Sequence, residues 1–279
     1  MNVIILGLNS GFSNSILNNL PADTKIVGTG RGVNRYSHDE RVIGFLSMDI
    51  TNDESVEDAM NNAISMLDDK VDAVINCIGM GTRGYSEKFT TDQMKKVFDI
   101  NIFGTQRLFR AILPQMKKQR FGSIITVTAL LGRFCVPFLG PYTSSKWALE
   151  GLLESYRHEL KKMGIGVFVV EPGAQSTNFG VNAMLPDAEE ATNRHYDEYD
   201  SLEVEFFKTL SSVMKEHTEQ DPAQVGKAIA DVALNPLDAP FRVEVDTTVI
   251  GEEIKKLNAS YEASMDKIFE GYQIKSLLK

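Results

Sequence analysis

The chain opens on a short apolar run that leads directly into a glycine turn, and this pairing restricts the fold more than any other feature. Residues 3–6 read Val-Ile-Ile-Leu, and Gly7 and Gly11 follow at once. Such a run is typical of a parallel strand that is buried on both faces. The glycines would let the backbone approach a pyrophosphate, which the N–H groups of the next helix can hold. An ordinary tight turn could also contain two glycines. Other positions must therefore show whether this turn binds a phosphate.

Strand and helix patterns alternate from this start as far as Val170. That alternation is typical of βαβ units, so it predicts an α/β fold with a parallel sheet. Up to Val170 we expect further strands at 25–29, 43–48, 71–76 and 166–170, helices at 53–67 and 141–163, and helical segments around Asn101 over 91–118. After it we expect a helix from Asp221-Pro222, a last strand at 241–245 and a C-terminal helix around 254–268. Residues 1–279 contain no repeat or linker, which predicts one domain.

Gly30 and Arg31 end the second predicted strand, nineteen residues past Gly11. In a dinucleotide fold the adenosine ribose binds at this point, where a carboxylate suits NAD and an arginine suits the 2′-phosphate of NADP. Gly30 has no side chain that can accept the ribose hydroxyls, and Arg31 can pair with a phosphate as a rigid fork. The sequence therefore favours NADP(H).

Tyr142 and Lys146 are four residues apart in a predicted helix, so they share one helix face. A free tyrosine titrates near pH ~10 and is a poor acid–base catalyst at neutral pH. A nearby positive charge favours the phenolate and lowers its pKa towards a working range. We therefore expect Tyr142 to exchange a proton with a substrate, with its pKa lowered by Lys146. The same pair can also occur on a solvated helix face. The neighbouring motifs must therefore show whether the pair is catalytic.

With these residues in place, the sequence resembles the short-chain dehydrogenase/reductase family over residues 3–177. Further landmarks follow in the family's order: Asp49, Asn76-Cys-Ile-Gly79, Asp99-Ile-Asn101-Ile-Phe-Gly104, Gly122 to Thr128, and Pro172-Gly173 with Thr177.

The resemblance implies a Rossmann-type doubly wound parallel sheet with helices on both faces, and a small-molecule substrate. Tyr142, Lys146 and Asn101 are the catalytic residues that it implies, with Asn101 holding Lys146 through an ordered water. The implied cofactor-binding residues are Gly7, Asn9, Ser10, Gly11, Phe12, Arg31, Asp49, Ile50, Asn76, Gly79, Tyr142, Lys146, Pro172, Gly173 and Thr177. No metal ion is expected. The protein is expected to form a homodimer or a homotetramer.

Two positions depart from the family's pattern. Ser13 replaces the third glycine of the phosphate turn, so we expect weaker or altered cofactor binding. Ala129 stands thirteen residues before Tyr142, where the family has its catalytic serine. Thr128 carries a hydroxyl one position away, but neighbouring side chains at a strand end point to opposite faces. The hydrogen bond that polarises the substrate carbonyl is therefore expected to be missing.

Three classes of function stay open. The first is an NADP(H)-dependent oxidoreductase that interconverts a carbonyl and an alcohol. The second is a non-catalytic or regulatory NADP(H)-binding protein, which the missing serine favours. The third is a dehydratase or epimerase on the same scaffold, because a fold does not determine a function.

Residues 174–220 are the least patterned part of the chain, and in the family this region covers the substrate pocket. Within it, apolar residues recur every three or four positions and predict an amphipathic helix: Tyr196, Tyr199, Leu202, Phe206, Leu210 and Val213. Residues 251–279 form a predicted C-terminal helical extension. Its layout loosely resembles 17β-hydroxysteroid and retinol dehydrogenases, which implies a hydrophobic carbonyl or alcohol as substrate.

Composition mainly excludes other classes. The net charge of −9 argues against a nucleic-acid partner, because no basic surface is expected. The two cysteines have no metal spacing or disulfide framework, and a reducing cytoplasm suits them. The first predicted strand starts at residue 3, so no signal peptide is expected. No apolar run approaches the roughly 18 residues of a membrane-spanning helix.

Overall fold

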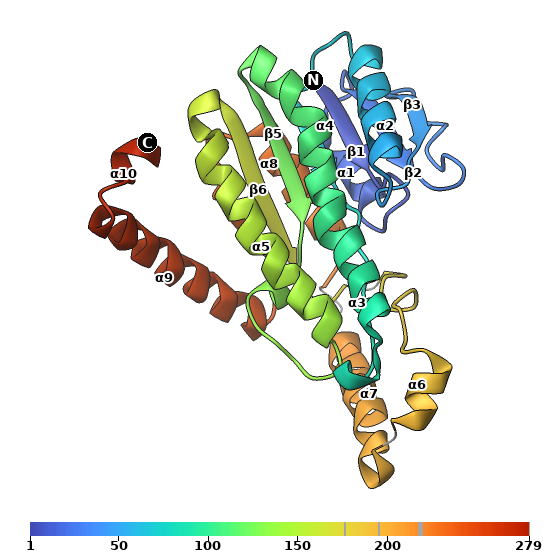
Figure 1. Ribbon diagram of the computed structural model, residues 1–279. Helices are drawn as coiled ribbons and strands as arrows, with labels where there is room; N and C mark the ends of the chain where they lie inside the picture. The colour runs from blue at the N-terminus through green and yellow to red at the C-terminus, as the bar shows by residue number, and fades with distance from the viewer. Residues whose placement is uncertain (176, 195, 217–219, 279) are drawn as a thin grey trace.

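The computed structural model describes residues 1–175, 177–194, 196–216 and 220–278, and a parallel sheet forms the centre of this described part (Figure 1). Its seven strands stand in the order β3-β2-β1-β4-β5-β6-β7. Each neighbouring pair is parallel. The chain direction across the sheet reverses between β1 and β4, the switch point at which doubly wound sheets bind ligands. The predicted α/β class with a Rossmann-type sheet is confirmed.

The elements follow the predicted alternation closely. The strands are β1 Asn2–Leu6, β2 Lys25–Gly30, β3 Val42–Ser47, β4 Ala73–Asn76, β5 Gly122–Val127, β6 Ile165–Pro172 and β7 Arg242–Val245. The helices are α1 Ser13–Asn19, α2 Asp53–Met66, α3 Thr91–Phe98, α4 Gly104–Gln119, α5 Gly140–Leu160, α6 Ala188–Asn193, α7 Asp200–Glu216, α8 Pro222–Leu234, α9 Val249–Gly271 and α10 Lys275–Leu278. Short helical turns are η1 Ser86–Lys88, η2 Asp99–Phe103, η3 Leu130–Gly132, η4 Lys161–Met163 and η5 Asp197–Tyr199.

Local chemistry explains where several helices begin. The side chain of Asn52 caps α2 by accepting a hydrogen bond from the first turn. Thr90 and Gln93 form a reciprocal capping box at the start of α3. Asp221 caps α8, and Pro222 occupies the first turn, where its missing N–H costs nothing.

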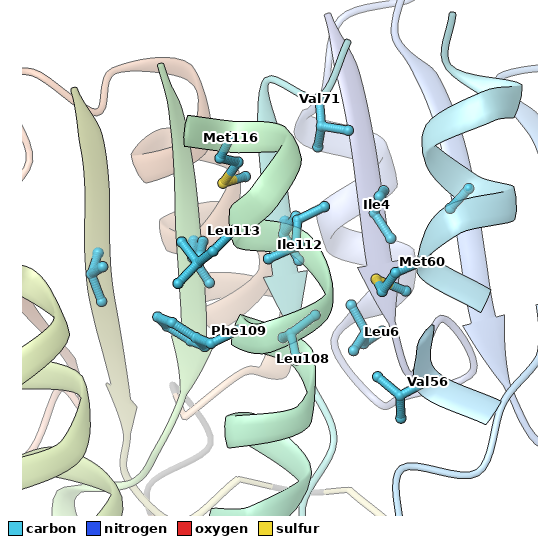
Figure 2. Close-up of a cluster of buried hydrophobic side chains, with 14 of the residues drawn as sticks. Ile4, Leu6, Val56, Met60, Val71, Leu108, Phe109, Ile112, Leu113 and Met116 are labelled. Atoms are coloured by element: carbon cyan, nitrogen blue, oxygen red, sulfur yellow. The ribbon is translucent and has the colours of Figure 1, made fainter. Parts of the chain in front are cut away.

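Helices cover both faces of the sheet and bury its apolar side chains. Figure 2 shows one face, where Met60 of α2 and Leu108 and Ile112 of α4 lie beside Ile4 and Leu6 of β1. On the other face, side chains of α1 and α8 cover the same strands. Fully burying one such side chain contributes about 1.5–3 kcal/mol, so these two layers hold the strand ends in place.

The predicted helical segments over 91–118 are α3 and α4, and a π-helical turn, η2, joins them. Such turns admit one extra residue and occur often at functional sites. Asn101 lies in its middle, buried, between α3 and α4. The helical periodicity on either side could not reveal this insertion.

The second half of the chain differs from the prediction in detail. The amphipathic helix starts at Asp200, and Tyr196 lies before it, stacked on Tyr85 with ring centroids 4.2 Å apart. The predicted C-terminal helix is α9, and His158 of α5 packs edge-on against its Phe269. Residues 176, 195 and 217–219 of the predicted covering segment lie outside the described residues. In the part of the chain that is described, no helix has the length and apolarity needed to span a membrane.

Candidate active site

A cavity of about 1900 Å³ opens where the strands end, at the switch point of the sheet. Residues that directly follow β1, β4, β5 and β7 line it. Most of the predicted site residues lie on its wall: Gly7, Asn9, Ser10, Gly11, Phe12, Arg31, Asp49, Ile50, Gly79, Tyr142, Lys146, Pro172, Gly173 and Thr177. Asn76 and Asn101 do not.

The glycine turn leaves its backbone open to the cavity. Gly7 adopts a left-handed conformation with φ of 74°, which glycine tolerates and other residues rarely do. A Cβ atom at Gly11 would lie 2.8 Å from Cγ2 of Thr177, so a larger residue would close the gap between two walls. Asn9 ties the turn to the next loop, because its Nδ2 donates to Val33 O and its Oδ1 accepts from Arg35 N. This cradle fits a dinucleotide phosphate bridge.

Two arginines and an aspartate mark the far end of the cavity. Arg31 and Arg35 both line it, after the end of β2. Asp49 accepts hydrogen bonds from the backbone N–H and hydroxyl of Thr51, which hold the pKa of its carboxyl below the usual value. Sequence reasoning found Arg31 and missed Arg35, although the second arginine lies four residues further along the same loop.

Tyr142 and Lys146 meet at the other end, as their spacing in α5 predicted. Lys146 Nζ lies 5.7 Å from the centre of the Tyr142 ring and donates to the carbonyl of Val127, 3.2 Å away. The Tyr142 ring is also tilted against Phe179, with centroids 5.5 Å apart. Both residues are nearly inaccessible, at 7% and 2% exposure.

Burial dominates the titration of this pair. It raises the pKa of the Tyr142 phenol above its ordinary value, so the expected lowering by Lys146 is not found here. It also lowers the pKa of Lys146 to about 8, partly opposed by the negative charge of Glu150. Both changes have one physical cause, because a buried site disfavours the charged form of each group.

The two predicted asparagines act from behind the cavity wall. Asn101 exchanges hydrogen bonds with the backbone of Met80, at 2.8 and 3.0 Å, and donates to Ser145 Oγ at 2.8 Å. Asn76 donates to Thr105 Oγ1 and accepts from Ile78 N–H. The cofactor contact of Asn76 stays a prediction. Its amide holds the turn that brings Gly79 to the cavity.

Ala129 lines the cavity with a methyl group and no hydroxyl. The neighbouring Thr128 also lines the cavity, but its hydroxyl is occupied, because it donates to Glu150 Oε1 at 2.6 Å.

Aromatic and aliphatic side chains line the remaining wall: Phe134, Val136, Leu139, Phe179, Phe206, Phe207, Leu210 and Met214. Those from α7 were only partly anticipated by its amphipathic pattern. The α7 segment is fastened to η1 by Lys88, whose ammonium lies 2.7 Å from Asp200, and by the Tyr85–Tyr196 stack. Among the described residues, no group of histidines, cysteines or carboxylates could hold a metal ion.

The sheet order, the glycine turn and the buried tyrosine–lysine pair define a nucleotide-binding oxidoreductase of the α/β class. A family model described as short chain dehydrogenase matches residues 2–186. The chain belongs to this family.

Two curated relatives align over most of the chain. It is 32% identical to a 3-ketodihydrosphingosine reductase of Bacteroides thetaiotaomicron over 249 residues, 88% of each protein. It is 30% identical to retinol dehydrogenase 8 of Bos taurus over 261 residues, 88% of this chain and 81% of the relative.

Solved structures share the fold. A short-chain dehydrogenase from Streptomyces avermitilis aligns with a TM-score of 0.76 at 24% identity, over 99% of both chains. One from Burkholderia cenocepacia in complex with NADP aligns at 0.68 and 21% identity, over 95% of this chain and 96% of the other. Another from Burkholderia phymatum in complex with NAD aligns at 0.73 and 19%, over 94% of each. Neighbours of this fold thus carry either nicotinamide cofactor.

Proposed function

We propose that the protein is an NADP(H)-dependent oxidoreductase that interconverts a carbonyl and an alcohol on a hydrophobic small molecule. The observation that carries this proposal is the approach of Lys146 Nζ to the Tyr142 ring, at 5.7 Å, on the wall of one large cavity. A proton donor and a cation placed together at the end of a dinucleotide cradle suit the reduction of a carbonyl.

In this proposal NADPH supplies the hydride, and the chain supplies the proton and the geometry. The Tyr142 hydroxyl gives its proton to the substrate oxygen, and takes it back in the oxidation direction. Lys146 offers a positive charge beside the phenol and binds the nicotinamide ribose. Asn101 fixes the Met80 backbone and Ser145. A Cβ at Gly79 would lie 3.5 Å from Lys146 Nζ and 3.7 Å from Asn101 Oδ1, which supports a shared water site between them.

The choice of NADP(H) is supported by charge. Arg31 and Arg35 both reach the cavity where the adenosine ribose would lie, and Gly30 offers no carboxylate. Guanidinium groups pair with a phosphate in fork geometry. Gly7, Asn9, Ser10, Gly11 and Phe12 would hold the pyrophosphate, Asp49 and Ile50 the adenine, and Pro172, Gly173 and Thr177 the nicotinamide.

A hydrophobic substrate is supported by the apolar wall that α7 contributes. We assign residues 174–220 as the segment that covers the substrate and 251–279 as the C-terminal extension of a single domain. The names of the two relatives point the same way, since one reduces 3-ketodihydrosphingosine and the other is a retinol dehydrogenase.

The experiment is a panel of long-chain and small ketones, aldehydes and alcohols, including 3-ketodihydrosphingosine and retinol, followed by NADPH absorbance and fluorescence. Turnover of at least one hydrophobic member supports the proposal. NADPH binding without turnover on any member would instead support a second candidate, a non-catalytic or regulatory NADP(H)-binding protein. The specific observation in favour of that candidate is Ala129, which leaves the substrate carbonyl without the family's hydroxyl donor.

The proposal also includes a cytoplasmic homodimer or homotetramer. Cys77 and Cys135 are both free, which suits a reducing compartment. Phe103 and Trp147 expose about half of their surface on neighbouring helical segments, at 53% and 46%. Light scattering coupled to size exclusion tests the oligomer: a monomer at micromolar concentration would contradict it.

A further inference from the structure

Glu150 is a buried carboxylate placed one helical turn after Lys146 on α5. It is 2% exposed. Its Oε1 accepts the hydrogen bond of Thr128, and its Oε2 accepts one from Arg242 Nε on β7, 2.9 Å away. A carboxylate this deep is costly unless it is both paired and hydrogen-bonded, and here it is both.

Lys146 and Glu150 attach α5 to two consecutive residues at the end of β5. Lys146 Nζ donates to Val127 O, and Thr128 Oγ1 donates to Glu150. Glu150 also supports η3 from below, since a Cβ at Gly132 would lie 2.8 Å from Glu150 Cγ. The stretch that presents Ala129 to the cavity is thus held at both ends by one side chain of the catalytic helix.

Lys146 and Glu150 are buried together in α5. Lys146 is 2% exposed, and the negative charge of Glu150 opposes the lowering of the Lys146 pKa by burial. Arg242 neutralises part of that charge but also binds Glu154, at 3.1 Å, and Glu262, at 3.4 Å. The charged and titratable groups packed around the Glu150–Arg242 pair are Lys146, Glu154 and Arg157 from α5, Glu171 from β6, Glu244 from β7, Tyr261 and Glu262 from α9, and Arg133 after η3.

We propose that Glu150 is a positioning residue: its carboxylate fixes the Thr128–Ala129 turn and places a negative charge one helical turn from the buried Lys146, beside Tyr142. The inference rests on the proposed function for its catalytic meaning. The contacts and charges themselves are properties of the chain alone, so they can be tested without a substrate.

The decisive variant is Glu150→Gln, which keeps the size of the side chain and an acceptor for Thr128 but removes the charge. The matched control is Glu154→Gln, which removes a second buried carboxylate bound to Arg242 but contacts neither Thr128 nor the cavity. The measurement is a side-chain NMR titration of protein that carries isotopically labelled lysine, with Lys146→Met to identify the Lys146 signal. Circular dichroism and thermal unfolding establish that each variant is folded.

We expect the proton-dissociation constant of Lys146 to rise about tenfold or more in Glu150→Gln. It should stay within about twofold of the wild type in Glu154→Gln, although both variants lose stability. Where the protein turns over a ketone, the alkaline limb of kcat should move to lower pH in Glu150→Gln alone. Equal dissociation constants of Lys146 in the two variants would overturn the inference, whatever the turnover.

A second variant tests whether Glu150 anchors the Thr128–Ala129 turn. It also replaces Glu150→Gln as the test if that variant does not fold. Glu150→Asp keeps the charge but withdraws it from Thr128. Hydrogen exchange of the Gly132 amide, which donates to Ala129 O at 2.8 Å, should then become at least about tenfold faster, with the Lys146 constant nearly unchanged. Unchanged exchange would contradict the proposed anchoring. A wild type without turnover on any substrate, but with these shifts, would refute the proposed catalysis and leave the role of Glu150 standing.

Discussion

Thr128 and Glu150 are joined by a 2.6 Å hydrogen bond that crosses from the end of β5 to α5. This bond occupies the Thr128 hydroxyl, one position before Ala129. The position at which the family places its serine therefore offers a methyl group to a substrate, and Thr128 cannot replace the missing donor while it remains bonded to Glu150.

Ala129→Ser is expected to raise the rate of hydride transfer to small generic ketones. One hydrogen-bond donor aimed at a developing oxyanion is worth on the order of 10²–10³ in rate. The measurement is single-turnover NADPH oxidation at saturating NADPH, with Thr128→Ser as the control that adds no new hydroxyl. A fast wild type with no gain in Ala129→Ser would mean that another group supplies the bond.

Tyr142→Phe is expected to abolish reductase activity while fold and NADPH affinity stay close to those of the wild type, because only the proton donor is lost. Tyr156→Phe is the matched control, since it removes one oxygen from the same helix, where the hydroxyl binds Gln106. Lys146→Ala should lose activity and NADPH affinity together. Retention of near wild-type turnover by Tyr142→Phe would refute the mechanism.

Arg31→Asp is expected to exchange the cofactor preference. The guanidinium would no longer pair with the 2′-phosphate, and the new carboxylate would repel it and accept the ribose hydroxyls of NAD. Fluorescence titrations with NADPH and NADH on both proteins measure this. Equal affinities in the wild type, or an unchanged ratio in the variant, would remove the assignment to NADP(H).

Lys88→Met is expected to raise KM for hydrophobic substrates severalfold and to leave NADPH affinity unchanged. Lys88 is almost buried and fastens the start of α7 through Asp200, so its loss loosens the apolar wall. The control is Lys256→Met, which removes an exposed lysine that pairs with Glu253. If both variants show the KM of the wild type, α7 does not depend on this contact.

Glu171→Gln is expected to stabilise the protein at alkaline pH. Burial and the charge of Glu150 raise the pKa of the Glu171 carboxyl to about 8, from an ordinary value of 4.5. The folded state therefore holds this proton more tightly than the unfolded state, and stability is lost as pH rises from about 4.5 through 8. Urea unfolding measures the free energy of unfolding, which should decrease less between pH 6 and pH 9 in the variant than in the wild type. An equal decrease would mean that a group other than Glu171 holds this proton.

Local patterns in the sequence predicted the elements and much of the site. Features that depend on a few neighbouring residues can be recognised from the sequence alone. Examples are the apolar run at residues 3–6, the cap at Asp221 and the spacing of Tyr142 and Lys146. The cavity wall assembled from strand ends was likewise anticipated, through the resemblance that those patterns supported.

Contacts distant in sequence could not be predicted in this way. Glu150 and Arg242 are 92 residues apart, and neither lies in a motif that names the other. Burial reversed the expected direction of the Tyr142 pKa, because desolvation depends on how the whole cavity closes around the ring. The resemblance implied a cofactor contact for Asn76, but it could not predict the hydrogen bonds of its amide with Thr105 and Ile78.

The π-helical turn η2 makes the placement of Asn101 and the packing of α4 depend on the same number of residues. One inserted residue rotates everything after it by about 100° around the helix axis. Leu108, Phe109 and Ile112 face the sheet, and Asn101 faces Met80 and Ser145, only with that insertion in place. Removing one residue between 99 and 103 would straighten the helix, but either the asparagine or the apolar stripe of α4 would turn towards the wrong neighbours. A continuous α-helix in this place would therefore lose either the contacts of Asn101 or the packing of α4 on the sheet.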